Sequence, residues 1–188
     1  MSPDVVIPGR GLQPAGPESI IANAVPAMSK KSAGILMYKG SADDLHFLLV
    51  HPGGPFWAKK DLGAWSIPKG EYLEAEDALA EAIREFQEEI GFVPVGEFLA
   101  LGELAQPSRK IVKAWAVEGD FDPGALKSNQ FEIEWPPRSG RKKSFPEVDR
   151  AEWFAPVQAR TKILKGQSGF IDRAIAAIGS PARSSLPG

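Results

Sequence analysis

The most acidic stretch of the chain is residues 70–92. Four of its glutamates have a spacing that could bring their carboxylates together in a reactive or ion-binding site. An α-helix places residues three and four positions apart on one face. The carboxylates that share such a face are Glu81, Glu85, Glu88 and Glu89. Like charges at this spacing repel one another, whereas a hard cation such as Mg²⁺ binds carboxylate oxygens. The stripe therefore indicates either a divalent-metal site or, as on many charged helices, a face exposed to water.

The same stretch carries an apolar face beside its acids. One arc of the helical projection collects Leu79, Ala82, Ile83, Phe86 and Ile90. Such an arc has the width of a surface that packs on a protein core. We therefore expect a helix that buries this arc and holds its carboxylates at the edge of the core.

The fixed residues of this stretch follow a definite spacing. Gly70 is followed after five residues by Glu76, and after seven more by the sequence REFQEEIGF, residues 84–92. With this spacing the chain resembles the Nudix hydrolase family, whose signature is matched at every fixed position. A chance match of seven identities is on the order of 10⁻⁷ per starting point. The resemblance implies an α/β fold, the Nudix-type α/β/α sandwich, in which a mixed sheet has helices on both faces.

The resemblance also implies roles for particular residues. Gly70 would turn the loop into the helix and offer its carbonyl to a metal ion, with Glu85, Glu88 and Glu89 as side-chain ligands. Arg84 would hold a glutamate in place through a charge-assisted hydrogen bond. These four charged residues form the expected catalytic set. The expected cofactor is Mg²⁺, for which Mn²⁺ could substitute.

Further positions of the signature have expected structural roles. Glu76 would brace the segment before the helix, and Gly91 suits the left-handed residue that commonly ends one. The resemblance does not decide which residue is the general base; the candidates are Glu85 and an acid of a later loop, such as Glu147.

Candidate substrate-binding residues lie outside the signature. Lys69 is placed to contact a phosphate, and Trp57, in a Gly/Pro-rich loop, could stack on a base. The basic cluster that could reach a polyphosphate contains Arg138, Arg141, Lys142 and Lys143. An ordinary solvated loop is an equal interpretation of this cluster. Trp135 alternates with Phe131 and Ile133, which favours a core position, and His51 is a weaker site candidate.

Periodicity and turn residues predict the elements that would position these groups. We expect strands in 32–39, 45–52, 64–68, 97–106, 110–119, 131–135 and 150–156, and terminal helices in 157–164 and 168–179. Residues 29–179 are expected to form one domain. The segment 1–28, rich in Pro and Gly, is expected to be a flexible arm, and 180–188 a disordered tail.

Composition narrows the class of protein. The chain has 188 residues, no cysteine and a formal net charge of −2. Lack of cysteine excludes disulfides and thiolate sites and favours the cytoplasm. No apolar run reaches the roughly 18 residues of a membrane span, so no membrane partner is expected. Outside residues 70–92 the charge balance is only +5, so we expect no stable nucleic-acid partner. RNA-cap removal is a further alternative, which this charge does not support strongly because it needs a broad basic surface.

These observations predict Mg²⁺-dependent hydrolysis of a pyrophosphate bond in a nucleoside diphosphate linked to another group. The sequence WSIPKG, residues 65–70, is most similar to the diadenosine polyphosphate hydrolase branch of the family, which suggests a dinucleoside polyphosphate. Nucleoside triphosphates and nucleotide sugars are alternative substrates. A non-catalytic nucleotide-binding sensor is the alternative of another class. A homodimer stays open.

Overall fold

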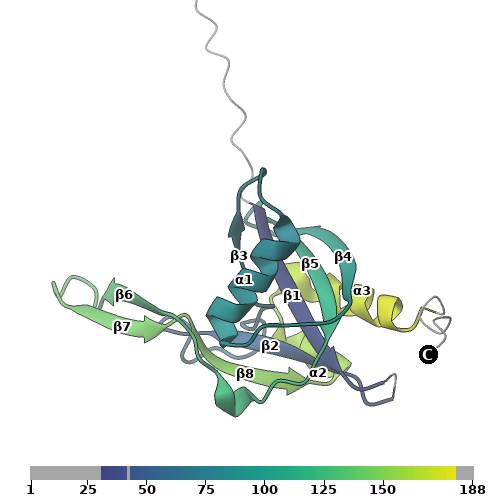
Figure 1. The fold of residues 1–188 in the computed structure, drawn as a ribbon. Helices are drawn as coiled ribbons and strands as arrows, with labels where there is room; N and C mark the ends of the chain where they lie inside the picture. The colour runs from purple at the N-terminus through teal and green to yellow at the C-terminus, as the bar shows by residue number, and fades with distance from the viewer. Residues whose placement is uncertain (1–30, 42, 181–188) are drawn as a thin grey trace, which may run out of the picture.

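The computed structural model describes residues 31–41 and 43–180 (Figure 1). The predicted arm 1–28 and residues 181–188 of the predicted tail lie outside these ranges. The elements in chain order are β1 (Lys31–Lys39), β2 (His46–Pro52), β3 (Lys69–Tyr72), α1 (Ala78–Ile90), β4 (Phe98–Ala105), β5 (Ile111–Glu118), β6 (Gln130–Glu134), β7 (Lys142–Pro146), β8 (Val148–Phe154), α2 (Pro156–Lys162) and α3 (Ser168–Ile178).

A mixed sheet of six strands forms the centre of the domain, with the order β4-β5-β1-β2-β8 and with β3 also paired to β1. Strand β1 runs parallel to β5 from Lys31 to Tyr38, while its other edge is shared by two antiparallel partners. The first half of that edge pairs with β3, from Lys31↔Tyr72 to Gly34↔Lys69. The last two residues of β1 pair with β2. The central strand therefore carries β3, which leads directly into α1.

The two faces of the sheet are covered by different helices, as Figure 1 shows. Alternate residues of a strand point to opposite faces. Ala33, Ile35 and Met37 of β1 are fully buried in a cluster with Phe86 of α1. Leu36 of the same strand is buried in a second cluster that contains residues of α2 and α3. The predicted sandwich, a mixed sheet with helices on both faces, is confirmed.

Helix α1 begins and ends at capping residues that the sequence supplies. The Asp77 side chain accepts hydrogen bonds from the amides of Leu79 and Ala80 at 2.9 and 3.3 Å. Gly91 ends the helix with φ of 81°, in the left-handed region where glycine carries no steric penalty. The apolar arc packs as predicted, with its fully buried members being Ala82, Phe86 and Ile90.

The structure corrects two expectations around the signature. Gly70 does not turn the chain into the helix, because it lies in β3 and pairs with Ala33. The predicted strand 64–68 is reduced to isolated bridges, Val50↔Ser66 and Trp65↔Ile163, because its backbone is shared between β2 and the end of α2. The regular strand begins at Lys69 instead.

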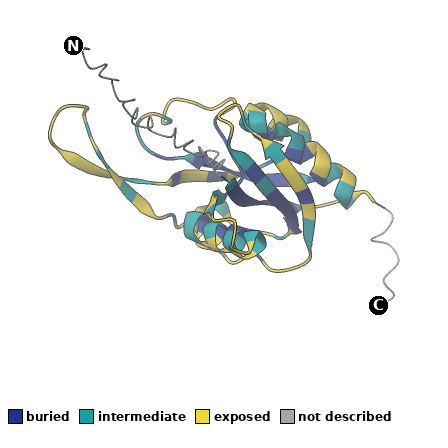
Figure 2. Cartoon of the chain, turned by 90° about the horizontal axis from the view of Figure 1, so that it is seen from above, coloured by how far each residue is buried: buried dark blue, intermediate teal, exposed yellow. Residues whose placement is uncertain are grey.

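A separate two-stranded sheet, the β6–β7 hairpin, projects from the domain beside α1 (Figures 1 and 2). The predicted basic loop is therefore largely the strand β7 and its turn. Trp135 is not a core residue, because the hairpin stands away from the main sheet and leaves this side chain only partly buried. Its ring packs edge-on against Phe56, with centroids 5.6 Å apart.

Within the described residues, none of the helices has the length and apolar character that crossing a membrane requires.

Candidate active site on helix α1

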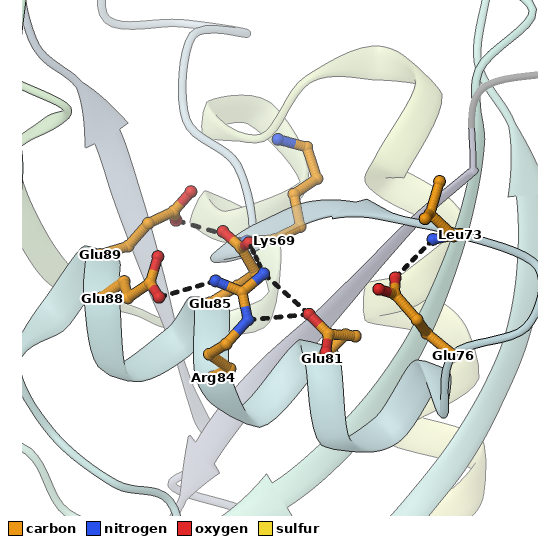
Figure 3. Close-up of polar contacts among 8 residues, drawn as sticks. All are labelled: Lys69, Leu73, Glu76, Glu81, Arg84, Glu85, Glu88 and Glu89. Carbon is orange, nitrogen blue, oxygen red and sulfur yellow. Dashed lines mark hydrogen bonds and ion pairs between the residues drawn. The ribbon is translucent and has the colours of Figure 1, made fainter.

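Arg84 gathers three of the four helix glutamates (Figure 3). Its Nε donates to Glu81 Oε2 at 2.8 Å, Nη1 to Glu88 Oε1 at 2.6 Å and Nη2 to Glu85 Oε1 at 2.6 Å. These charge-assisted bonds raise the pKa of the guanidinium, with Glu81 and Glu88 contributing most. Arg84 therefore compensates the repulsion along the acidic stripe and fixes the carboxylate of Glu85.

The other acids of the stretch have structural partners. Glu76 accepts from the amide of Leu73 at 2.6 Å, as expected for a residue that braces the turn before α1. Glu71 is paired with Lys110 at 3.1 Å, and Glu74 with Lys31 at 3.0 Å. Within residues 70–92, the crowded carboxylates are thus those of the helix.

Glu85 lies directly against the backbone of β3. An added Cβ at Gly70 would collide with the Glu85 carboxylate, so only glycine permits this approach. Burial raises the pKa of Glu85, and the charges of Glu88 and Glu147 add to that effect, while Arg84 opposes it. Helix and strand therefore bring this carboxylate and the Gly70 backbone together.

Glu89 is the most perturbed acid of the site. Its Oε2 accepts from the Lys69 amide at 3.3 Å. Burial raises its pKa to about 7, although the Lys69 charge and amide act in the opposite direction. Burial also lowers the pKa of the Lys69 ammonium. The predicted site residue Lys69 thus lies beside the glutamates.

Glu147, which follows β7, completes the acidic group. Its charge is near enough to raise the pKa of both Glu85 and Glu89. Its amide donates to Asn129 O at 2.8 Å, and the Asn129 amide donates to Glu88 O at 3.3 Å. The base of the hairpin is therefore attached to the C-terminal end of α1.

The acidic group fits a divalent cation by its chemistry. Among residues 31–41 and 43–180 no three acidic or histidine side chains already converge as a metal site; Arg84 binds Glu88, and the Lys69 amide binds Glu89. All nearby donors are carboxylate or carbonyl oxygens, which suit hard ions such as Mg²⁺. The raised pKa values of Glu85 and Glu89 show that this place disfavours further negative charge, which a cation would balance.

Three predicted substrate-binding residues lie apart from the glutamates. Trp57 packs against the cluster that contains α2 and α3, with Lys60 Nζ 4.4 Å from its ring centroid. Arg138 and Arg141 lie at the end of the hairpin away from α1. The structure does not place any of the three beside the carboxylates, and their roles stay predictions.

Two features escape sequence reasoning. His51 is fully buried, with Nδ1 2.7 Å from Asp149 Oδ1 and Nε2 2.9 Å from Lys60 O, which makes it a structural tie between strand and loop. The pairing of Phe56 with Trp135 joins residues far apart in the chain, and the only local signal is the presence of Phe56 in a Gly/Pro loop.

Comparison with known proteins agrees with this geometry. The family model described as the NUDIX domain matches residues 28–174. No curated protein sequence matches the chain closely enough to serve as a relative.

Solved structures share the fold at low sequence identity. A C. elegans Ap4A hydrolase in a binary complex has a TM-score of 0.53 and 21% identity, over 77% of this chain and 96% of that one. The NUDIX domain of Shewanella oneidensis NrtR, complexed with ADP ribose, has a TM-score of 0.53 and 15% identity, over 78% and 86%. The E. coli ORF135 protein has a TM-score of 0.52 and 17% identity, over 84% and 95%.

The predicted family is therefore confirmed over most of the chain, and its signature residues lie on β3, on α1 and in the segments that flank this helix. The chain belongs to the NUDIX domain family and is a Nudix hydrolase.

Proposed function

We propose that this hydrolase cleaves a pyrophosphate bond of a dinucleoside polyphosphate with the help of Mg²⁺, for which Mn²⁺ can substitute. The observation that carries the proposal is the crowding of Glu85, Glu88, Glu89 and Glu147 at one end of α1, with burial raising the pKa of two of them. Such a group is costly in a metal-free protein and favourable around a cation. The proposed ligands are the Gly70 carbonyl and the side chains of Glu85, Glu88 and Glu89.

A bound divalent ion would neutralise the anionic pyrophosphate and activate the attacking water. The chain's own residues have separate tasks. Arg84 holds the carboxylates of Glu85 and Glu88 in a fixed orientation. Lys69, whose amide binds Glu89, is proposed to bind a phosphate oxygen through its ammonium group.

The general base is proposed to be Glu147 or Glu85. Both belong to the acidic group, and Glu147 is exposed, which leaves its carboxylate accessible to a water molecule. Removing a general base commonly costs roughly 10²–10⁴-fold in turnover. Glu147→Gln should show a loss in this range if Glu147 is the base. A small loss would leave Glu85 as the base.

The choice of substrate rests on three observations. The sequence WSIPKG resembles the diadenosine polyphosphate branch, the fold is shared with a C. elegans Ap4A hydrolase, and the hairpin whose base is attached to α1 carries basic residues farther along. The fold is also shared with a NUDIX domain complexed with ADP ribose. Other nucleotides that contain a pyrophosphate link are therefore alternative substrates. The cytoplasm stays the location predicted from the cysteine-free sequence.

A panel of nucleotides tests the proposal directly. The full chain is incubated with Mg²⁺ or with EDTA, and the products are separated by chromatography. Diadenosine tetraphosphate should be cleaved with a higher kcat/KM than ATP, and EDTA should abolish turnover. Equal or better efficiency on nucleoside triphosphates or on a nucleotide sugar would reject the substrate. Binding without hydrolysis of any compound would favour the sensor alternative.

A further inference from the structure

The β6–β7 hairpin has two chemically different faces. Residues directly opposite in an antiparallel pair share a face. The register Phe131↔Phe145 and Ile133↔Lys143, continued by the hydrogen bond from the Trp135 amide to Arg141 O at 2.8 Å, therefore defines one of them. We call it the aromatic–basic face; it consists of Phe131, Ile133, Trp135, Arg141, Lys143 and Phe145.

Rings and cations contact one another along this face. The centroids of Phe131 and Phe145 are 6.2 Å apart, and Lys143 Nζ lies 5.2 Å from the Phe145 centroid. The loop after β2 extends the face, because Phe56 packs edge-on against Trp135. The Phe56 side chain is nevertheless 63% exposed. A large apolar ring is thus held in a defined place while most of its surface faces solvent, as in sites where aromatic rings stack on bases.

Charge is distributed unequally between the two faces. Within strands β6 and β7, which are described in full, the opposite face carries the acids Glu132 and Glu134 with one cation, Lys142. On the aromatic–basic face the charged residues are the cations Arg141 and Lys143, without an acid. A ligand that offers both a flat ring and negative charge fits this combination, and a nucleoside with phosphates has both.

The position of the hairpin connects this face to the glutamates. Its base is tied to α1 through the Asn129 amide and Glu88 O, and Glu147 follows β7 directly. A strand rises about 3.4 Å per residue, so Trp135 lies roughly 20 Å along the hairpin from Asn129. A second nucleoside, separated from the cleaved bond by several phosphates, would extend in this direction.

We infer that the aromatic–basic face, completed by Phe56, is a binding site for the second nucleoside of the substrate and the phosphates attached to it. This inference rests on the proposed function and adds the residues that would distinguish a dinucleotide from a mononucleotide. Phe56 stacks on the distal base, and Lys143 and Arg141 neutralise the distal phosphates.

The test compares two substrates with the same number of phosphates. Diadenosine tetraphosphate has the second nucleoside and adenosine 5′-tetraphosphate lacks it, so the ratio of their kcat/KM values isolates the distal site. Phe56→Ala should lower this ratio roughly tenfold, within the range of base–aromatic stacking. Lys143→Ala should lower it several-fold. The matched control is Lys142→Ala, one residue away on the opposite face, which should keep the wild-type ratio.

Two results of this kinetic comparison would overturn the inference. One is a ratio that Phe56→Ala leaves unchanged, and the other is an equal effect of Lys142→Ala and Lys143→Ala. All three side chains are on the surface, and melting temperatures close to wild type will show that the variants fold.

A binding measurement separates failure of this inference from failure of the proposed function. If the wild-type protein hydrolyses neither tetraphosphate, calorimetry with a methylene-bridged analogue of diadenosine tetraphosphate takes the place of kinetics. A tenfold weaker Kd in Phe56→Ala would support the site even then, and absence of binding would overturn it. Tighter binding of a 5′-phosphorylated single-stranded RNA, lost in the same variants, would assign the face to RNA and overturn the nucleoside site.

Discussion

Metal-free protein with the substitution Glu89→Gln should become more stable than the wild type as the pH rises from about 4.5 to 7. Burial raises the pKa of Glu89 from 4.5 to about 7 in the folded state. Between these values the folded protein holds a proton that the unfolded chain has released, so wild-type stability falls as pH increases. Glutamine stays neutral and removes this loss.

The magnitude follows from the same shift. A pKa of about 7 in place of 4.5 corresponds to at most about 3 kcal/mol above pH 7. Partial exposure of the carboxylate brings the expected effect to about 1–2 kcal/mol. For a domain of this size, the Tm of Glu89→Gln minus that of the wild type should therefore be about 2–8 °C larger at pH 8 than at pH 4.

Thermal unfolding in EDTA, followed by circular dichroism at several pH values, measures this difference. Glu132→Gln, on an exposed position of β6, serves as the matched control. Addition of Mg²⁺ at pH 8 should stabilise the wild type more than Glu89→Gln, because ligand binding to the folded state adds to its stability. A difference between variant and wild type that stays constant from pH 4 to 8 would refute the reasoning.

Four further predictions concern the site and the core. Glu88→Gln should lower kcat by orders of magnitude with little change in Tm, and wild-type activity in Mg²⁺ would contradict its role as a ligand. Gly70→Ala should displace the Glu85 carboxylate, so that steady-state assays show a large loss of activity in a folded protein. Phe86→Ala should cost about 3–5 kcal/mol in the free energy of unfolding, measured with urea, because the ring is fully buried. A chain that begins at Met28 should melt within a few degrees of the full chain, and a large drop would contradict the predicted arm.

The local pattern of apolar, polar and capping residues predicts those elements whose structure depends on residues close to one another in the sequence. The two faces of α1 follow from a period of 3.6 residues, and its ends from Asp77 and Gly91, which act within a single turn. The same holds for the pair β4 and β5, whose antiparallel contact needs only a short turn. Glu85, Glu88 and Glu89 are found on one helix for this reason.

Contacts between distant segments are not available to such reasoning. Strand β3 contains Lys69, Gly70 and Glu71, which have no marked preference for a strand, and it forms because β1 offers an edge. The parallel pairing of β1 with β5 is of the same kind. For Trp135, the alternation of apolar and polar residues correctly indicates that one face of the strand is partly buried. It does not tell whether that face packs on the protein core or only on the ring of Phe56.

The hydrogen bond between Asn129 and Glu147 closes the base of the β6–β7 hairpin, so the rest of the domain does not depend on the length of the hairpin. Because these two residues already meet at 2.8 Å, the chain enters and leaves the hairpin at one point. Residues 130–146 could therefore lengthen, shorten or change composition while the backbone on either side keeps its path. If the aromatic–basic face binds the second nucleoside as proposed, variation in this segment would alter which molecules are accepted and leave the glutamates of α1 in place. In protein design, the hairpin could therefore be replaced by another whose ends are the same distance apart, without altering the rest of the domain.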